Sequence, residues 1–371
     1  MSIKFKMLLT GLILPVFLGT NTTNAQLFQD STTMNLIKKN IDCIYNMEFT
    51  NANEIFLKIR KSYPGHPVMF LLKGLHTYWK NYPLLNTNPA HIQFEEDLRQ
   101  CIRLSEKNRI PAYEAEYLLN NLCARGMLLE YYNDNKLTLD VIPLATGTYS
   151  NLRKSFALTN SSVDLKYYTG VYNYYREAYP NVFPVYKPLA LLFPSGNIHT
   201  GLKDLQDAAI SGIVLRAESY YLLACIYLSF ENKYQKAIGY CKSLNTLYPD
   251  NVLYLSMYIK NLLLLKHYDE AEKLIVRSQK ETENKFFRAQ LFIFNGILQE
   301  KKYHDLNQAQ YSYHTGVSRI ILFGSYGNEC AAFGYFGLSR ISELKGEKNN
   351  STKFREKAMK LSAFKNINFD N

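Results

Sequence analysis

The sequence predicts an all-α fold, a right-handed α-α superhelix of about 14–16 helices that stack in pairs. Apolar residues recur at three- and four-residue spacing along most of the chain, and no stretch alternates cleanly enough to indicate a strand. Proline, glycine and asparagine break this pattern at helix-length intervals. Two stretches also repeat each other at a thirty-four-residue period, so that Tyr220, Tyr234 and Ala237 recur as Tyr254, Tyr268 and Ala271.

The N-terminus has the pattern of a secretory signal peptide over residues 1–25. Lys4 and Lys6 precede an apolar run from Met7 to Gly19, and a small-residue cleavage site ends at Ala25. The alternative, an uncleaved membrane anchor, is disfavoured because the run is about thirteen residues, short of the roughly twenty that span a bilayer. We therefore expect an exported, periplasmic or envelope-associated protein that is soluble after cleavage, with residues 26–371 forming one helical-repeat domain.

Proline and asparagine clusters divide the mature chain into its expected helices. They fall at 64–67, 83–89, 133–135, 160–162, 180–188, 194–196, 249–251, 280–284 and 348–350. Between residues 89 and 213 the thirty-four-residue register is lost. There we expect helices at 90–106, 111–132, 137–158, 162–179 and 197–211, with the proline-rich segment 179–196 as a crossover or a pocket-lining loop.

The repeated stretches resemble the tetratricopeptide repeat (TPR) family, whose units carry small residues at positions eight and twenty. In the best-matched repeats, 218–283, Cys225 and Ala237 take those positions in the first unit and Ala271 takes the second of them in the next. Ile259 and Glu283 depart from the pattern. Partial matches place further small residues at close helix crossings: Ala52, Gly74, Gly296, Ala309, Gly346 and Ala358, with Ser351 where alanine is usual.

The same resemblance implies which residues line the concave groove of the superhelix. The candidates for ligand contact are Tyr78, Trp79, Ser229, Phe230, Ser256 and Lys260. This mixture suits a peptide or partner helix, because apolar contacts dominate and a few polar groups anchor the ligand. Trp79, the single tryptophan, could equally serve core packing. The tyrosine-rich stretch 167–180, with Gly170 within it, is typical of a tightly packed helix, or alternatively of a ligand-facing aromatic surface.

The positive charge of the chain suits acidic partners or an anionic envelope, and the cysteine pattern bears on disulfide bonding. The formal net charge is +11, and removal of Lys4 and Lys6 with the signal peptide leaves +9. The basic residues are dispersed rather than concentrated in a stripe, so no nucleic-acid partner is expected. The six cysteines lie in apolar helical patterns or apart from one another, which favours free buried thiols, and a Cys225–Cys241 bridge is the alternative.

No constellation of catalytic, cofactor or metal-binding residues stands out. The seven histidines are dispersed and no nucleotide-binding or hydrolase motif occurs, so no catalytic residue, cofactor or metal is expected. The Glu218-Ser219 pair resembles the catalytic Glu-Ser of lytic transglycosylases, but the Gly-Leu-Met-Gln segment of that family is absent.

These observations predict a non-enzymatic protein- or peptide-binding scaffold of the cell envelope. One alternative is a periplasmic glycan- or small-molecule-binding protein that uses the tyrosine-rich helices. A second is a helical cell-wall enzyme, for which Glu177 and Glu218 would be the candidate carboxylates.

Overall fold

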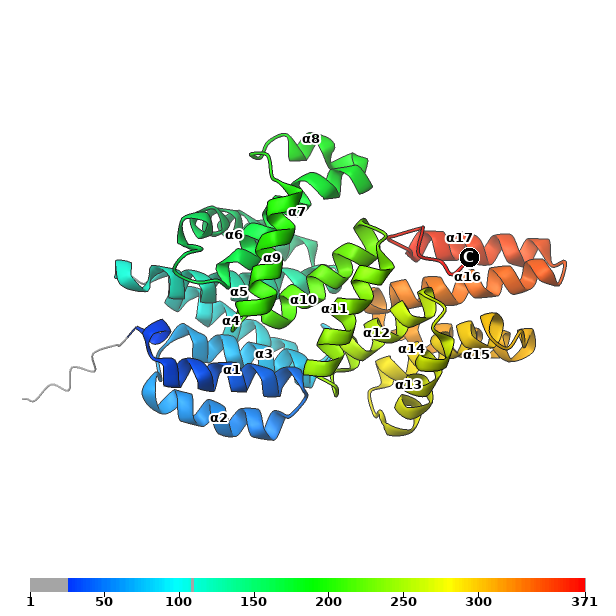
Figure 1. Cartoon of the computed structure of the whole chain (residues 1–371), viewed down its shortest axis with the longest axis horizontal. Helices are drawn as coiled ribbons and strands as arrows, with labels where there is room; N and C mark the ends of the chain where they lie inside the picture. Colours follow the sequence, from blue (N-terminus) through cyan, green and yellow to red (C-terminus); the bar gives the residue numbers. More distant parts are fainter. Residues whose placement is uncertain (1–25, 108–109, 371) are drawn as a thin grey trace, which may run out of the picture.

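The computed structural model describes residues 26–107 and 110–370, so the predicted signal peptide lies outside the described residues. Within this part every regular element is a helix, which confirms the all-α prediction (Figure 1). It contains sixteen α-helices of ten or more residues and the four-residue α8 (Lys187–Ala190). Short helical turns adjoin them: η1 (Leu27–Gln29), η2 (Pro111–Tyr113), η3 (Pro184–Tyr186), η4 (Ile226–Phe230) and η5 (Ile321–Gly327).

The long helices pack as consecutive pairs along the superhelix. The eight pairs are α1 (Ser31–Tyr45) with α2 (Phe49–Ser62), α3 (Pro67–Lys80) with α4 (Ala90–Glu106), α5 (Glu114–Asp134) with α6 (Thr138–Leu158), α7 (Leu165–Val182) with α9 (Ile198–Ser211), α10 (Arg216–Cys225) with α11 (Tyr234–Leu247), α12 (Val252–Leu264) with α13 (Tyr268–Glu281), α14 (Lys285–Lys301) with α15 (Leu306–Ile320), and α16 (Asn328–Leu344) with α17 (Lys348–Leu361). The five helices predicted in the irregular middle correspond to α4–α7 and α9, with ends displaced by three residues at most.

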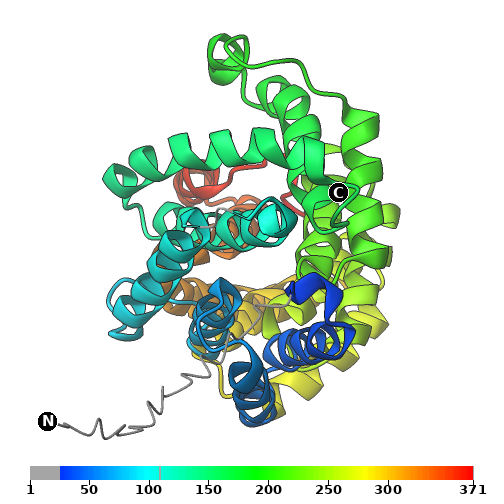
Figure 2. The same ribbon diagram turned by 90° about the vertical axis from the view of Figure 1, so that its left-hand side faces the viewer.

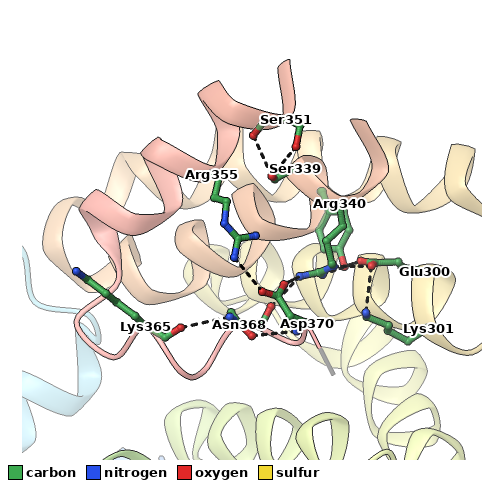
Figure 3. Close-up of polar contacts among 10 residues, drawn as sticks. Glu300, Lys301, Ser339, Arg340, Ser351, Arg355, Lys365, Asn368 and Asp370 are labelled. Carbon is green, nitrogen blue, oxygen red and sulfur yellow. Dashed lines mark hydrogen bonds and ion pairs between the residues drawn. The ribbon is translucent and has the colours of Figure 1, made fainter. Parts of the chain in front are cut away.

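A small residue marks the close approach of the two helices in a pair. Ala52, Ala237, Ala271 and Ala309 are each the fourth residue of the second helix of a pair, and each is fully buried. Ser351 takes this place in the last pair, where the Ser339 hydroxyl donates to its carbonyl oxygen over 2.9 Å (Figure 3). The small residue at this position of the second helix agrees with what the tetratricopeptide resemblance implies for these pairs.

Glycines allow a similarly close approach in two pairs, and Gly201 is itself the fourth residue of α9. In the tyrosine-rich helix α7, a Cβ on Gly170 would lie 2.8 Å from Leu205 Cγ and 2.9 Å from the Gly201 carbonyl oxygen of α9. A Cβ on Gly296 of α14 would lie 2.6 Å from the buried ring of Tyr313 in α15. The prediction that Gly170 lies in a tightly packed helix is therefore confirmed.

The superhelix turns far enough for its N-terminal pair to contact the α10–α12 region (Figures 1 and 2). Asp42 Oδ1 accepts hydrogen bonds from the Tyr248 hydroxyl at 2.7 Å and from Arg216 Nη2 at 3.1 Å. Asn251 Nδ2 donates to the Tyr45 carbonyl oxygen over 2.8 Å, and both residues are buried. These bonds join residues about two hundred positions apart and close one turn of the superhelix.

The loop after α3 makes a second set of closing contacts, with α14 and η5. Asn284 Nδ2 donates to the Tyr82 carbonyl oxygen over 2.8 Å, and the Tyr326 hydroxyl donates to that of Leu84 over 3.2 Å. The first helices of several pairs consequently face one another across the superhelix axis.

The segment between α7 and α9 forms a structured crossover. The Tyr172 hydroxyl donates to the Pro194 carbonyl oxygen over 2.6 Å, and Arg176 donates to that of Phe193 over 3.2 Å. The short helix α8 projects from the body in Figure 1, with Leu189 and Leu191 exposed.

The C-terminal tail folds back over the last pairs and is held by Arg340 (Figure 3). The guanidinium group forms two hydrogen bonds with Glu300, at 2.6 and 2.8 Å, and Nη1 bonds Asp370 Oδ1 at 2.9 Å. Glu300 is buried, yet its pKa lies below the usual value, because its bonds with Arg340 and Tyr313 outweigh the effect of burial. Phe369 packs edge-on against Phe333 at 5.1 Å, so the tail is part of the folded body.

Two further sequence features have a clear outcome. All six cysteines are free, which confirms the thiol interpretation over a Cys225–Cys241 bridge. No helix in the described part of the chain is both long enough and apolar enough to cross a membrane.

We predict that Asn251→Ala lowers the free energy of unfolding by about 2–3 kcal/mol, because it removes the N-cap of α12 and leaves the buried Tyr45 carbonyl unpaired. Asn197→Ala is the matched control, since Asn197 caps α9 from an exposed position, and should cost only about 1 kcal/mol. Urea denaturation measures both. If the two variants lost the same free energy of unfolding, the role of Asn251 in closing the superhelix would be contradicted.

We predict that Gly296→Ala destabilises the protein by about 1–3 kcal/mol, because its Cβ would overlap the Tyr313 ring. Gly239→Ala in α11 should stabilise it by about 0.5–1 kcal/mol, because nothing lies within 4 Å of that Cβ and alanine favours the helix. Thermal unfolding compares the two variants. If alanine raised the Tm at both positions, helix propensity rather than the spacing of the helix pair would determine the effect.

Candidate functional site

A partly enclosed cavity of 330 Å³ lies where the first helices of six pairs converge around the superhelix axis. Its lining comes from α1, α3, α5, α7, α10 with the residues just before it, and α12: Ile41, Tyr45, Leu71, Leu72, Leu75, Tyr78, Trp79, Cys123, Gly126, Met127, Glu130, Tyr167, Tyr168, Val214, Leu215, Glu218, Tyr221, Leu222, Leu253 and Tyr254. We call this the lumen cavity. The closing contacts between α1 and the α10–α12 region complete its wall.

Aromatic rings form much of this wall, and Trp79 is central among them. Its ring lies 5.4 Å from Tyr45, 5.8 Å from Tyr254 and 5.3 Å, in stacked geometry, from Tyr82. Trp79 is 7% exposed, so the same side chain packs in the core and presents one edge to the cavity. Such rings offer large apolar faces and π-electron density to a ligand.

Glu218 brings a carboxyl group into this aromatic surrounding from the first turn of α10. Its Oε2 atom is buried and has no hydrogen-bond partner. Burial raises the pKa of Glu218 to about 8, because a carboxylate loses hydration among apolar groups. A buried polar atom without a partner is costly in a folded protein and marks a site where a ligand group could supply the missing bond.

Glu130 reaches the lumen cavity from the last turn of α5. More than a third of its surface is exposed to solvent. Partial desolvation by neighbouring protein atoms, followed by repulsion from Asp134, raises its pKa to about 7, and burial raises the pKa of Asp134 to about 6. The helix C-terminus also disfavours negative charge there.

These three carboxyl groups have no cationic partner among the residues that the structure describes. None of them forms an ion pair, and no lysine, arginine or histidine lines the lumen cavity. Lys260, which also lies in the interior, is already paired with Glu329 at 2.9 Å. The lumen cavity is therefore acidic, in a chain whose formal net charge is +11.

The predicted groove residues divide into two sets. Tyr78 and Trp79 both line the lumen cavity. The structure places the other four outside the lining, with Ser256 buried in α12 and Lys260 in its ion pair. Ser229 and Phe230 belong to η4, and Phe230 packs 5.1 Å from the ring of Tyr175.

A π-helical turn accounts for the position of Ser229 and Phe230. The groove positions were counted along a regular α-helix, but α10 passes into η4 at Ile226. There the Glu231 amide donates to the Ile226 carbonyl over 2.9 Å, a five-residue step. The wider turn rotates the following side chains away from the face that carries Glu218 and Leu222.

The acidic lining was not among the predicted features, although the sequence contains a pattern for it. In α5, Cys123, Gly126, Met127 and Glu130 share one face at the spacing i, i+3, i+4 and i+7. A glutamate that ends an apolar stripe of this kind would face the interior. Glu218 was considered only for catalysis, and Tyr221 and Tyr254 lie on the same inner faces.

A second hollow of 310 Å³ lies on the outer side, between α4, α5 and α6, and is lined by three arginines. Each arginine already has a partner: Arg99 bonds Tyr132, Arg103 bonds Gln100, and Arg125 pairs with Glu106 at 2.7 Å. Within residues 26–107 and 110–370, no group of three or more His, Cys, Asp or Glu side chains is placed to hold a metal ion. The lumen cavity is therefore the stronger candidate site.

Comparison with known proteins leaves the family unassigned. No family model matches the chain, and neither does any curated protein. Among solved structures, the chain is similar to the Rap conjugation gene regulator of the plasmid pLS20 in complex with the Phr* peptide. The TM-score is 0.41 at 13% identity, over 89% of this chain and 94% of the regulator. A similarity this low carries no inference about the function of this chain.

We predict that Glu218→Gln stabilises the protein more at pH 8 than at pH 5. The pKa of Glu218 rises from an ordinary 4.5 in the unfolded chain to about 8 in the fold. Between these values the folded state binds more protons, so its stability falls as pH rises, and the glutamine variant lacks this loss. The Tm of the variant minus the Tm of the native protein should increase by about 4 °C from pH 5 to pH 8.

Thermal unfolding at the two pH values measures the effect. The control is Glu281→Gln, because Glu281 is exposed and pairs with Arg277 on α13. Its Tm difference should stay constant over the same pH range. A Glu218→Gln difference that is also independent of pH would contradict the assigned protonation.

Proposed function

We propose that the chain is a non-enzymatic binding protein of the cell envelope that holds a peptide segment of a protein partner in the lumen cavity. The envelope setting rests on the predicted signal peptide. The observation that carries the proposal is the convergence of six helices on one partly enclosed, largely apolar cavity that includes several aromatic rings. Concave, mostly apolar sites with a few polar groups are the usual form of ligand sites in proteins.

The dimensions of the lumen cavity favour an inserted side chain or chain end over a docked globular surface. Its 330 Å³ accommodates one or two large side chains, while the flanking inner faces of α3 and α12 offer apolar contacts to the adjoining residues. Leu71 and Leu253 stand on these faces. A short peptide would thereby bury apolar area at the centre and stay accessible at its ends.

A second candidate is the binding of a glycan or another small molecule. It is favoured by Tyr167 and Tyr168 of the tyrosine-rich helix, which both line the lumen cavity. Their hydroxyl groups and rings would suit a sugar, which needs stacking and hydrogen bonds together. In a thermal-shift screen with oligosaccharides, a specific stabilisation would favour this candidate over the peptide.

Glu218 also keeps the enzymatic alternative open to test. A carboxyl group held protonated near neutral pH in an aromatic pocket suits a general acid. If the native protein bound its partner but did not turn over peptidoglycan fragments, the non-enzymatic proposal would be supported. Turnover that Glu218→Gln abolishes would overturn it.

We expect Gly126→Leu to abolish partner binding without unfolding the protein. Gly126 lines the lumen cavity, and its nearest atom to an added Cβ is the Tyr168 hydroxyl at 3.8 Å, so a larger side chain fills the cavity rather than the core. Gly126→Ala is the matched control, because its single methyl group leaves most of the cavity open. Affinity capture from envelope extracts compares the native protein with both variants.

The proposal requires proteins that the native chain and Gly126→Ala enrich and Gly126→Leu does not. Enrichment of the same proteins by all three would place the partner site outside the lumen cavity. A small molecule in the purified native protein, with no enriched protein, would favour the second candidate.

A further inference from the structure

We propose that the lumen cavity selects an organic cation, a primary ammonium or guanidinium group, carried by a lysine or arginine side chain of the bound peptide. This inference rests on the proposed function, because it names the chemistry of the group that enters the cavity. Its first support is the Glu218 carboxyl group, whose Oε2 is buried without a partner. An ammonium or guanidinium donor would provide the missing charge-assisted hydrogen bond.

The second support is the charge of the side chains that line the cavity. None of its titratable lining residues can carry positive charge: they are Glu130, Glu218, Cys123, Tyr45, Tyr78, Tyr167, Tyr168, Tyr221 and Tyr254. Lys260, which acts on the pKa of the neighbouring Cys225, is already paired with Glu329. The cavity can thus become neutral only by binding protons or by binding a cation.

The third support is the aromatic wall around the carboxyl groups. Trp79 lies 5.4 Å from Tyr45 and 5.8 Å from Tyr254, and all three rings line the cavity with Glu218. A cation over such a ring is attracted by its π electrons, and the attraction is larger where water is displaced. A neutral apolar side chain would fill the same space but leave Glu218 unpaired.

Cation binding should be coupled to proton release. Without a ligand, the carboxyl groups hold protons near neutral pH, and a lysine ammonium group, with an ordinary pKa of about 10.4, keeps its charge there. The cation replaces those protons, so affinity should rise with pH between 6 and 8. A neutral ligand of the same shape should show no such rise.

The chain contains a built-in reporter for this measurement. Trp79 is the single tryptophan of the sequence and lines the cavity, so its fluorescence reports occupancy directly. The probes are a blocked Gly-Lys-Gly peptide, the matching norleucine peptide, 1-aminopentane and 1-pentanol. The two peptides separate the ammonium group from the alkyl chain, and the free amine separates a small-molecule source from a peptide source. Calorimetry repeats each titration, so that a complex without a fluorescence change is still detected.

At pH 8 we expect the lysine peptide to bind at least about tenfold more tightly than the norleucine peptide. Its affinity should rise at least about tenfold from pH 6 to pH 8. Glu218→Gln should remove most of both effects, and Glu130→Gln, which alters a residue open to the lumen, provides a second variant. Glu281→Gln on the outer surface should bind as the native protein does, and circular dichroism verifies the fold of each variant.

The remaining outcomes separate this inference from the proposed function. Equal binding of the lysine and norleucine peptides would overturn the cation inference and leave the peptide site standing. Binding of 1-aminopentane with no binding of either peptide would support the cation site and count against the peptide proposal. Absence of binding by every probe, or lysine-peptide binding unchanged in both carboxyl variants, would overturn the inference.

Discussion

The close approach of the two helices in each pair is the constraint on which the rest of the structure depends. In four of the eight pairs it occurs at the fourth residue of the second helix, where Ala52, Ala237, Ala271 and Ala309 are fully buried, and Gly201 and Ser351 take the same place in two others. A larger side chain there would separate the helices and change the angle at which successive pairs stack. Because each pair adds to the same turn, a small change in spacing would accumulate along the superhelix. The meeting of α1 with the α10–α12 region thus depends on the spacing within the pairs between them, including the contact of Gly170 in α7 with Gly201 and Leu205 in α9.

That closure converts an open concave face into a cavity. In an open superhelix, Glu218 would lie on a surface exposed to water, and its carboxyl group would be well hydrated. The bonds from Tyr248 to Asp42 and from Asn251 to the Tyr45 carbonyl bring the far wall into place. Enclosure then removes much of the water around Glu218 and raises its pKa. The chemistry of the site therefore follows from a tertiary contact rather than from a local motif.

This distinction explains how far the sequence could predict the structure. Helix spacing and the alanine register are local properties, so the helices and the tight packing at Gly170 followed from periodicity and residue size. Tyr78 and Trp79 reach the cavity because α3 is a regular helix whose faces can be counted. Ser229 and Phe230 lie in the π-helical turn η4 and do not line it, and Ser256 and Lys260 lie outside the lining although α12 is regular. Closure could not be predicted, since it joins side chains about two hundred residues apart and no repeat pattern encodes that distance.

The acidic cavity has a thermodynamic consequence for the protein without a ligand. Unpaired carboxyl groups in an enclosed site reduce folding stability as pH rises, and an apolar replacement would remove that penalty. Residues that weaken the fold in this way are typical of binding sites, where ligand contacts offset the penalty. The buried Lys260 is paired with Glu329, a carboxylate that is about half exposed. Glu218 and Glu130 lack such a partner within the described chain, and this difference is the basis of the cation site proposed for the lumen cavity.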